Sequence, residues 1–156
     1  GRWEEAEREL DRVLVDAAER PLTAAMAMVL RAQLRRRQGR LDDAAAELAP
    51  AEREPYRRAV RHLVLAARAA LELDRGEPQA AADLAERYLR AVSEADRIER
   101  VEALEVLVRA RLALDEVRGA EQAVAELEAT AAVIPTDGFR ASALTGRARS
   151  RRRSRR

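Results

Sequence analysis

The sequence predicts an all-α protein built as a stack of antiparallel helix pairs, and three observations lead to this fold class. A sequence motif that begins with Gly at residues 1–6 is repeated at residues 39–44 and, less closely, at residues 76–81. The motifs begin 38 and then 37 residues apart, a period typical of helical repeats in which each pair packs only on its neighbours. Of the 74 apolar residues, 35 are Ala and only 3% of the chain is aromatic, which suits close helix packing and suits a sheet poorly.

The N-terminal part of the chain contains three expected helices. Residues 2–16 place apolar side chains at helical spacing, with Glu and Arg on the other face. A second helix is expected over residues 22–38, because Gly39 provides a stop. A shorter third helix begins at Leu41 and ends near Pro50.

The sequence pattern in the middle of the chain predicts two longer helices. Pro55 opens the first at a position where its missing N–H costs nothing, and the apolar stripe continues to Asp74. The second spans residues 78–92. No Gly or Pro separates it from the next helix, so we place the turn at residues 93–96, where Ser or Asp can cap a new N-terminus.

The C-terminal part predicts two more helices and the beginning of a third. Apolar spacing runs over residues 98–114 and again over residues 120–134, with a break at residues 115–117. Residues 135–138 form a turn, after which Phe139 starts a helix that the apolar pattern does not continue. We therefore expect about seven helices plus a partial eighth.

Two regions follow from this pattern. Residues 1–146 form the helical solenoid, and residues 147–156, with seven Arg and no acid, form a disordered Arg-rich tail. Neither end of the solenoid resembles the polar cap that such stacks need. The sequence thus predicts an interior fragment that self-associates through exposed repeat ends, unless residues 2–16 act as a cap.

The composition excludes several kinds of chemistry. All 30 basic residues are Arg, Cys is absent, and His62 is the single histidine. A P-loop, a Schiff-base lysine, a thiol nucleophile, a disulfide and a Cys-bearing zinc site are therefore excluded. Acidic pairs such as Glu102 and Glu105 lie on helices rich in Arg, where ion pairing explains them. We expect no enzymatic activity and no cofactor.

Charge and hydropathy limit the classes of partner and the cellular location that we expect. Residues 1–146 carry 23 Arg against 28 acids, which argues against the basic face of a nucleic-acid-binding domain. Residues 147–156 could instead bind phosphate backbones without sequence preference. No apolar stretch approaches the length of a membrane span. Because the chain lacks Cys, a reducing compartment fits, and the cytoplasm is the expected location.

The repeated motif resembles the tetratricopeptide repeat. Gly stands at the turn between two helices, an aromatic residue or Leu follows two positions later, and Ala three positions after that. This pattern is met at Gly1, Trp3 and Ala6, and again at residues 39–44. The third unit places Pro78 at the aromatic position, and the fourth, at residues 115–120, lacks the Gly. The resemblance implies a superhelical stack of antiparallel helix pairs, with repeats longer than the usual length of about 34 residues.

The amino-acid sequence of residues 33–44, 69–78 and 103–114 also resembles the tetratricopeptide region of LuxR-type bacterial transcription regulators. That resemblance covers roughly residues 1–146. It implies a protein-interaction or effector-sensing segment that couples partner binding to a helix-turn-helix domain, which these residues do not contain. Two alternatives are a free-standing scaffold that binds a peptide or protein, and a nonspecific nucleic-acid binder that acts through the Arg-rich tail.

The resemblance also implies where a partner would bind. In tetratricopeptide folds the first helix of each pair lines the concave surface, so Gln33, Arg37 and Arg109 are candidate groove contacts. The guanidinium groups of Arg37 and Arg109 could bind carboxylates in bidentate fashion. The alternative is that these side chains pair with nearby acids on the outer face.

Overall fold

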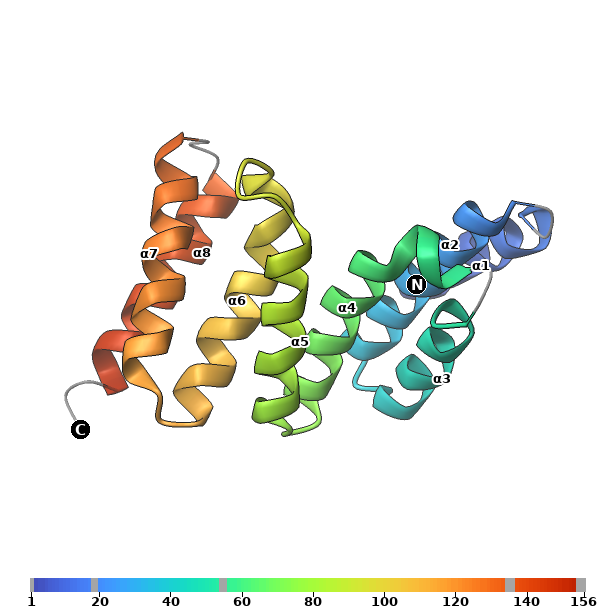
Figure 1. Cartoon of the computed structure of the whole chain (residues 1–156). Helices are drawn as coiled ribbons and strands as arrows, with labels where there is room; N and C mark the ends of the chain where they lie inside the picture. The colour runs from blue at the N-terminus through green and yellow to red at the C-terminus, as the bar shows by residue number, and fades with distance from the viewer. Residues whose placement is uncertain (1, 18–19, 54–55, 134–136, 154–156) are drawn as a thin grey trace.

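The computed structural model confirms the all-α class, and the residues that it describes form eight helices arranged in chain order along a stack (Figure 1). It describes residues 2–17, 20–53, 56–133 and 137–153. The helices are α1 (Arg2–Asp16), α2 (Pro21–Arg37), α3 (Leu41–Ala51), α4 (Tyr56–Asp74), α5 (Pro78–Ala91), α6 (Arg97–Ala113), α7 (Val117–Val133) and α8 (Asp137–Arg153). Pro55, the expected start of the fourth helix, lies outside the described residues.

The helices form two layers that differ in how they pack. Helices α2, α4, α6 and α8 contact one another in sequence and form what we call the even layer. Each of α3, α5 and α7 packs between two successive helices of that layer, whereas within the described residues no two of these three touch each other. Among the described residues, every contact between neighbouring pairs therefore involves a helix of the even layer.

The core consists of small side chains, as the Ala-rich composition predicts. The contact of α4 and α5 with α6 is formed largely by six alanines with at most 3% exposure: Ala69, Ala70, Ala81, Ala82, Ala85 and Ala110. Larger side chains fill the space on either side, and Leu48, Leu71 and Leu104 are each 1% exposed. Since Ala has no side chain beyond Cβ, these helices can approach closely.

Three turns share one backbone conformation at the end of an even-layer helix. Gly39, Gly76 and Asp115 have φ values of 79°, 83° and 64°, in the left-handed region. The residue after each donates its backbone N–H to the carbonyl five residues earlier, at 2.9 Å after Gly39 and Gly76 and 2.8 Å after Asp115. This is the Schellman arrangement, which favours Gly. The fourth unit therefore keeps the turn of the repeat although it has lost the glycine.

Replacing Asp115 with Gly is expected to raise the free energy of unfolding by about 0.5–1 kcal/mol, because Gly adopts positive φ without a Cβ penalty. Urea denaturation followed by far-ultraviolet circular dichroism measures the change. The reciprocal variants Gly39→Ala and Gly76→Ala are expected to lose about 1 kcal/mol each. A Cβ added at either glycine would have no atom within 4 Å. The stability that these two variants lose therefore measures backbone strain alone. A less stable Asp115→Gly protein would contradict the interpretation.

The turn between α5 and α6 lies where the sequence predicts it, but Asp96 does not cap α6 with its side chain. The Ser93 hydroxyl accepts a bond from the backbone N–H of Ala95 at 3.2 Å. A buried side chain holds this turn instead. Arg100, 6% exposed, donates to the carbonyl oxygens of Leu89 at 2.6 Å and Val92 at 3.0 Å, and its Nε donates to a Glu126 carboxylate oxygen at 2.7 Å.

The phenol of Tyr88 adds a second link at the same turn. Tyr88 is buried and donates its hydroxyl to the carbonyl oxygen of Glu99 at 2.9 Å. Burial, with the negative charges of Glu99 and Glu102, raises the pKa of Tyr88, so the neutral donor form is favoured.

The eighth helix is complete, and the expectation of a partial helix followed by a disordered tail is wrong for residues 147–153. Ala143, Gly146 and Ser150 lie on one face of α8 and are buried. A Cβ on Gly146 would lie 3.2 Å from the Val124 side chain, so α8 approaches α7 closely there. Arg147 forms an ion pair with Glu128. Packing of a small-residue face therefore extends the helix. Residues 154–156 lie outside the described part, as do residues 134–136 of the expected turn.

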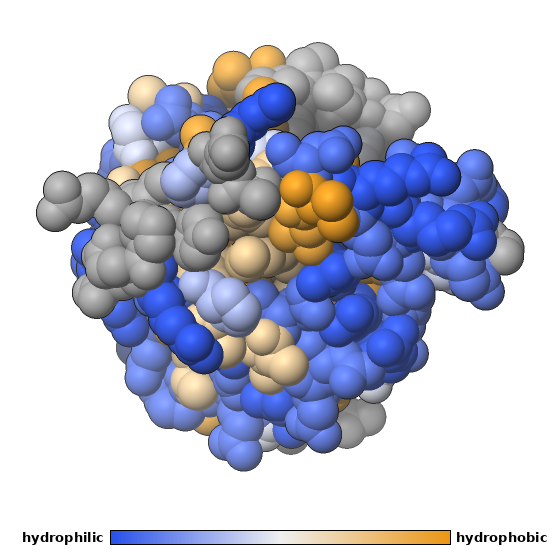
Figure 2. Space-filling model, turned by 90° about the vertical axis from the view of Figure 1, so that its right-hand side faces the viewer, coloured by the Kyte–Doolittle hydropathy of each residue, from blue (hydrophilic) through white to orange (hydrophobic). Residues whose placement is uncertain are grey.

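Large apolar side chains remain exposed at the α1–α2 end of the stack. Met26 and Leu30 of α2 are 44% and 51% exposed. Leu22, on the same side of α2 by helical spacing, is 50% exposed, and Trp3 of α1 is also 50% exposed. Figure 2 views this end, where apolar patches lie within a mostly hydrophilic surface. Self-association through this end stays a prediction.

Candidate binding groove

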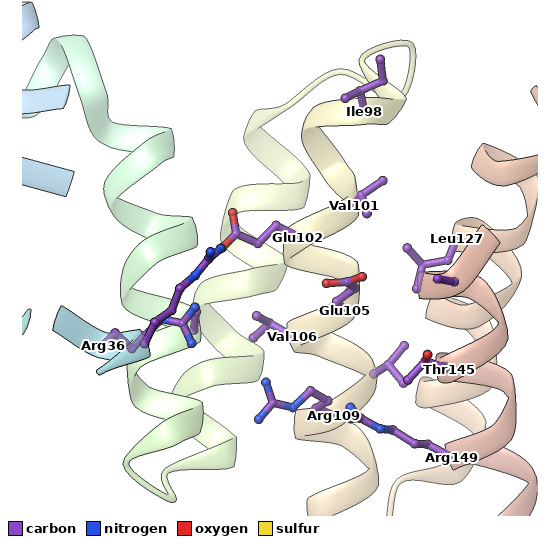
Figure 3. Close-up of a pocket in the computed structure, with 15 residues that line it drawn as sticks. Arg36, Ile98, Val101, Glu102, Glu105, Val106, Arg109, Leu127, Thr145 and Arg149 are labelled. Atoms are coloured by element: carbon purple, nitrogen blue, oxygen red, sulfur yellow. The ribbon is translucent and has the colours of Figure 1, made fainter. Parts of the chain in front are cut away.

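A groove of about 630 Å³ opens along the even layer and reaches from α2 to α8 (Figure 3). Side chains of α2, α4, α6, α7 and α8 line it, so residues more than a hundred positions apart share one surface. Its lining residues are Arg36, Arg37, Ala70, Ile98, Val101, Glu102, Glu105, Val106, Val108, Arg109, Leu127, Ala141, Thr145, Gly146 and Arg149.

The apolar part of the groove is supplied chiefly by α6. Val101, Val106 and Val108 are largely buried, and Leu127 of α7 is 2% exposed. Ile98, at the N-terminal end of α6, is instead 57% exposed. The groove therefore offers both a packed apolar surface and one accessible apolar side chain, which lies in Figure 3 at the opposite end of α6 from Arg109.

Arginines gather at the end of the groove where α2, α4 and α6 terminate. Arg36 donates to the Asp74 carboxylate at 2.5 Å, and Arg109 donates to the other oxygen of the same carboxylate at 3.2 Å. Asp74 is the last residue of α4. This carboxylate therefore ties three even-layer helices together and compensates part of the charge of both arginines.

Other charged groups in the groove make no hydrogen bond or ion pair with the residues that the structure describes. Among the described residues, neither Arg37 nor Arg149 makes a hydrogen bond or an ion pair, and the same is true of Glu105. Arg37 and Arg149 are exposed, while Glu105 is half-buried. Among the described lining residues, Arg37 and Arg149 thus carry unpaired guanidinium groups, and Glu102 and Glu105 carry carboxylates without a hydrogen bond or ion pair, beside an apolar surface.

The structure brings together two of the three side chains that the sequence singled out. Arg37 and Arg109 both line the groove, whereas Gln33 is half-buried on α2 and is not among the lining residues. Sequence reasoning missed Arg149, because it was assigned to a disordered tail, and it assigned Glu105 to ordinary ion pairing. The spacing of the small residues at 143, 146 and 150 is the signal that could have revealed the helix bearing Arg149.

Other kinds of site are not found in the part of the chain that the structure describes. No group of three or more His, Cys, Asp and Glu side chains there could hold a metal ion. His62 is exposed on α4. The described helices also include none with the length and apolar character needed to cross a bilayer.

Comparison with protein-family models, with curated proteins and with solved structures gives no significant match. The geometry of the groove and the sequence resemblance therefore carry the functional proposal.

Proposed function

We propose that the chain is a non-enzymatic protein-interaction or effector-sensing repeat segment whose groove binds a peptide segment of a partner. The observation that supports this most is the presence of unpaired charges of both signs, on Arg37, Arg149 and Glu105, beside an apolar surface. The volume of about 630 Å³ falls within the range of about 300–1,000 Å³ typical of ligand sites.

The chemistry of these groups suits a segment of mixed charge. A guanidinium fork binds a carboxylate through two parallel hydrogen bonds, so Arg37 or Arg149 would bind an acidic side chain or a chain terminus. Glu105 would accept bonds from a basic side chain of the same partner. Exposed Ile98 would contact an apolar residue.

The two free arginines belong to the first and last helices of the even layer. A ligand that binds both must match the distance between α2 and α8, which depends on how the helices between them are packed. Such a ligand would favour one curvature of the stack over others, since a ligand shifts an equilibrium toward the state it binds better. This coupling is what a sensing segment requires.

The biological context that we propose is a LuxR-type transcription regulator, in which the repeats would pass partner or effector binding to a helix-turn-helix domain. The resemblance of residues 33–44, 69–78 and 103–114 supports this context. Reading the gene beyond these repeats tests it, because a regulator would encode a helix-turn-helix there and a free-standing scaffold would not.

Charge reversal tests the groove directly. An array of short immobilised random peptides, probed with the full chain, is expected to select peptides that combine an acidic, a basic and an apolar residue. Arg37→Glu and Arg149→Glu are each expected to weaken binding of the selected peptides at least tenfold, measured by isothermal titration calorimetry, because each removes a charge-assisted bond and adds repulsion.

The matched control is Arg118→Glu. Arg118 is an exposed α7 arginine that lies outside the groove and has no partner among the described residues. Its reversal changes the net charge equally and is expected to leave peptide affinity unchanged. Equal losses in all three variants would show that binding depends on overall charge, and would contradict the groove.

A further inference from the structure

A second cavity, of about 290 Å³, lies on α4 between α3 and α5 and is separate from the groove. It shares no lining residue with the groove, so its properties do not depend on the function proposed above. Its lining residues are Ala51, Glu52, Arg61, Val64, Leu65, Arg68, Leu84 and Arg87.

The cavity exists because α3 is short. Helix α3 has 11 residues, whereas α5 has 14 and α7 has 17. Glu52, directly after α3, pairs with Arg68 in the middle of α4, so α3 ends at that level. Because α3 and α5 make no contact with each other, the described residues of these two helices leave a side of α4 uncovered beyond this point.

The floor of the cavity is apolar. Ala51, Val64 and Leu65 are at most 9% exposed, and half-buried Leu84 of α5 completes the surface. These side chains offer a ligand an apolar contact area. A ligand that used only polar groups would leave that surface unused.

The rim of the cavity is cationic. Arg61 and Arg87 are exposed, and neither has a hydrogen bond or ion pair among the residues that the structure describes. Arg68 donates two bonds to one Glu52 oxygen, at 3.0 and 2.8 Å. Arg68 also forms an ion pair with Glu72 at 3.7 Å. The lining therefore carries three guanidinium groups and one carboxylate, and Arg61 and Arg87 have no ion pair among the described residues.

We propose that this cavity is a binding site for a small amphiphilic anion, a carboxylate carrying a short apolar chain. The chain would cover the apolar floor, and the carboxylate would lie between Arg61 and Arg87, where two guanidinium groups can supply parallel hydrogen bonds. The volume limits the ligand to a small molecule. Glu52 repels such an anion and competes with it for Arg68.

Isothermal titration calorimetry of the full chain with octanoate tests the proposal. Saturable binding is expected, and Arg61→Ala and Arg87→Ala are each expected to weaken it about tenfold, since each removes a hydrogen bond to a charged group. Glu52→Gln is expected to tighten binding, because it removes the competing charge. Arg118→Ala is the control and is expected to leave the affinity unchanged.

Two further probes separate the contributions of charge and apolar contact. Inorganic phosphate carries charge without an apolar chain, and octylammonium carries the chain with the opposite charge, so both are expected to bind more weakly than octanoate. Absence of saturable octanoate binding, equal affinity for octylammonium, or octanoate affinity unaffected by Arg61→Ala and Arg87→Ala would overturn the proposal. Phosphate binding as tight as octanoate binding would overturn the amphiphilic character of the ligand. Peptide binding in the groove is measured separately and is unaffected by these outcomes.

Discussion

Replacing Arg100 with Ala is expected to lower the free energy of unfolding by about 3 kcal/mol. The guanidinium group is almost fully buried and donates to the carbonyl oxygens of Leu89 and Val92, which end α5, as well as to Glu126 of α7. Its removal leaves these acceptors without a donor and opens a void beside them. Urea denaturation followed by circular dichroism at 222 nm measures the loss.

Two variants separate the buried network from the charge alone. Arg97→Ala, at the start of the same helix, removes one exposed bond to the carbonyl oxygen of Ala129, and less than about 0.5 kcal/mol is expected to be lost. Arg100→Lys keeps the charge but not the planar fork, so it is expected to recover only part of the stability. If Arg100→Ala cost no more than Arg97→Ala, the network would not hold the turn.

Leu104→Ala is expected to destabilise the protein by about 2–5 kcal/mol, through lost burial and the cavity it leaves. Leu104 is 1% exposed and belongs to the cluster in which α6, α7 and α8 meet, with Val108, Val124 and Leu127 among its members. The C-terminal helices therefore depend on it. The same denaturation experiment measures the change.

The control for this substitution is Leu144→Ala on α8, where the leucine is 64% exposed. A change within about 0.5 kcal/mol is expected there, because little apolar area returns to water. Hydrogen exchange adds a local measurement, since Leu104→Ala should lower protection in α6–α8 more than in α1–α3. Equal effects of the two leucine substitutions would contradict the position of Leu104 in the core.

The sequence by itself determined the all-α class, because helical spacing and glycine-led turns are local signals that repeat along the chain. Gly39 and Gly76 adopt the positive φ values that such turns require, and the break at Asp115 was recognisable without a glycine. The resemblance to tetratricopeptide repeats singled out Gln33, Arg37 and Arg109, and the two arginines line the groove.

Only the tertiary structure decided which charged side chains meet, because that depends on contacts between distant segments. Arg149 joins the groove because Ala143, Gly146 and Ser150 pack and extend α8 through a segment whose composition favours disorder. No local pattern distinguishes buried Arg100 from the other 29 arginines, since its partners lie on α5 and α7. The repeat pattern thus fixes the helices, whereas packing between them fixes the sites.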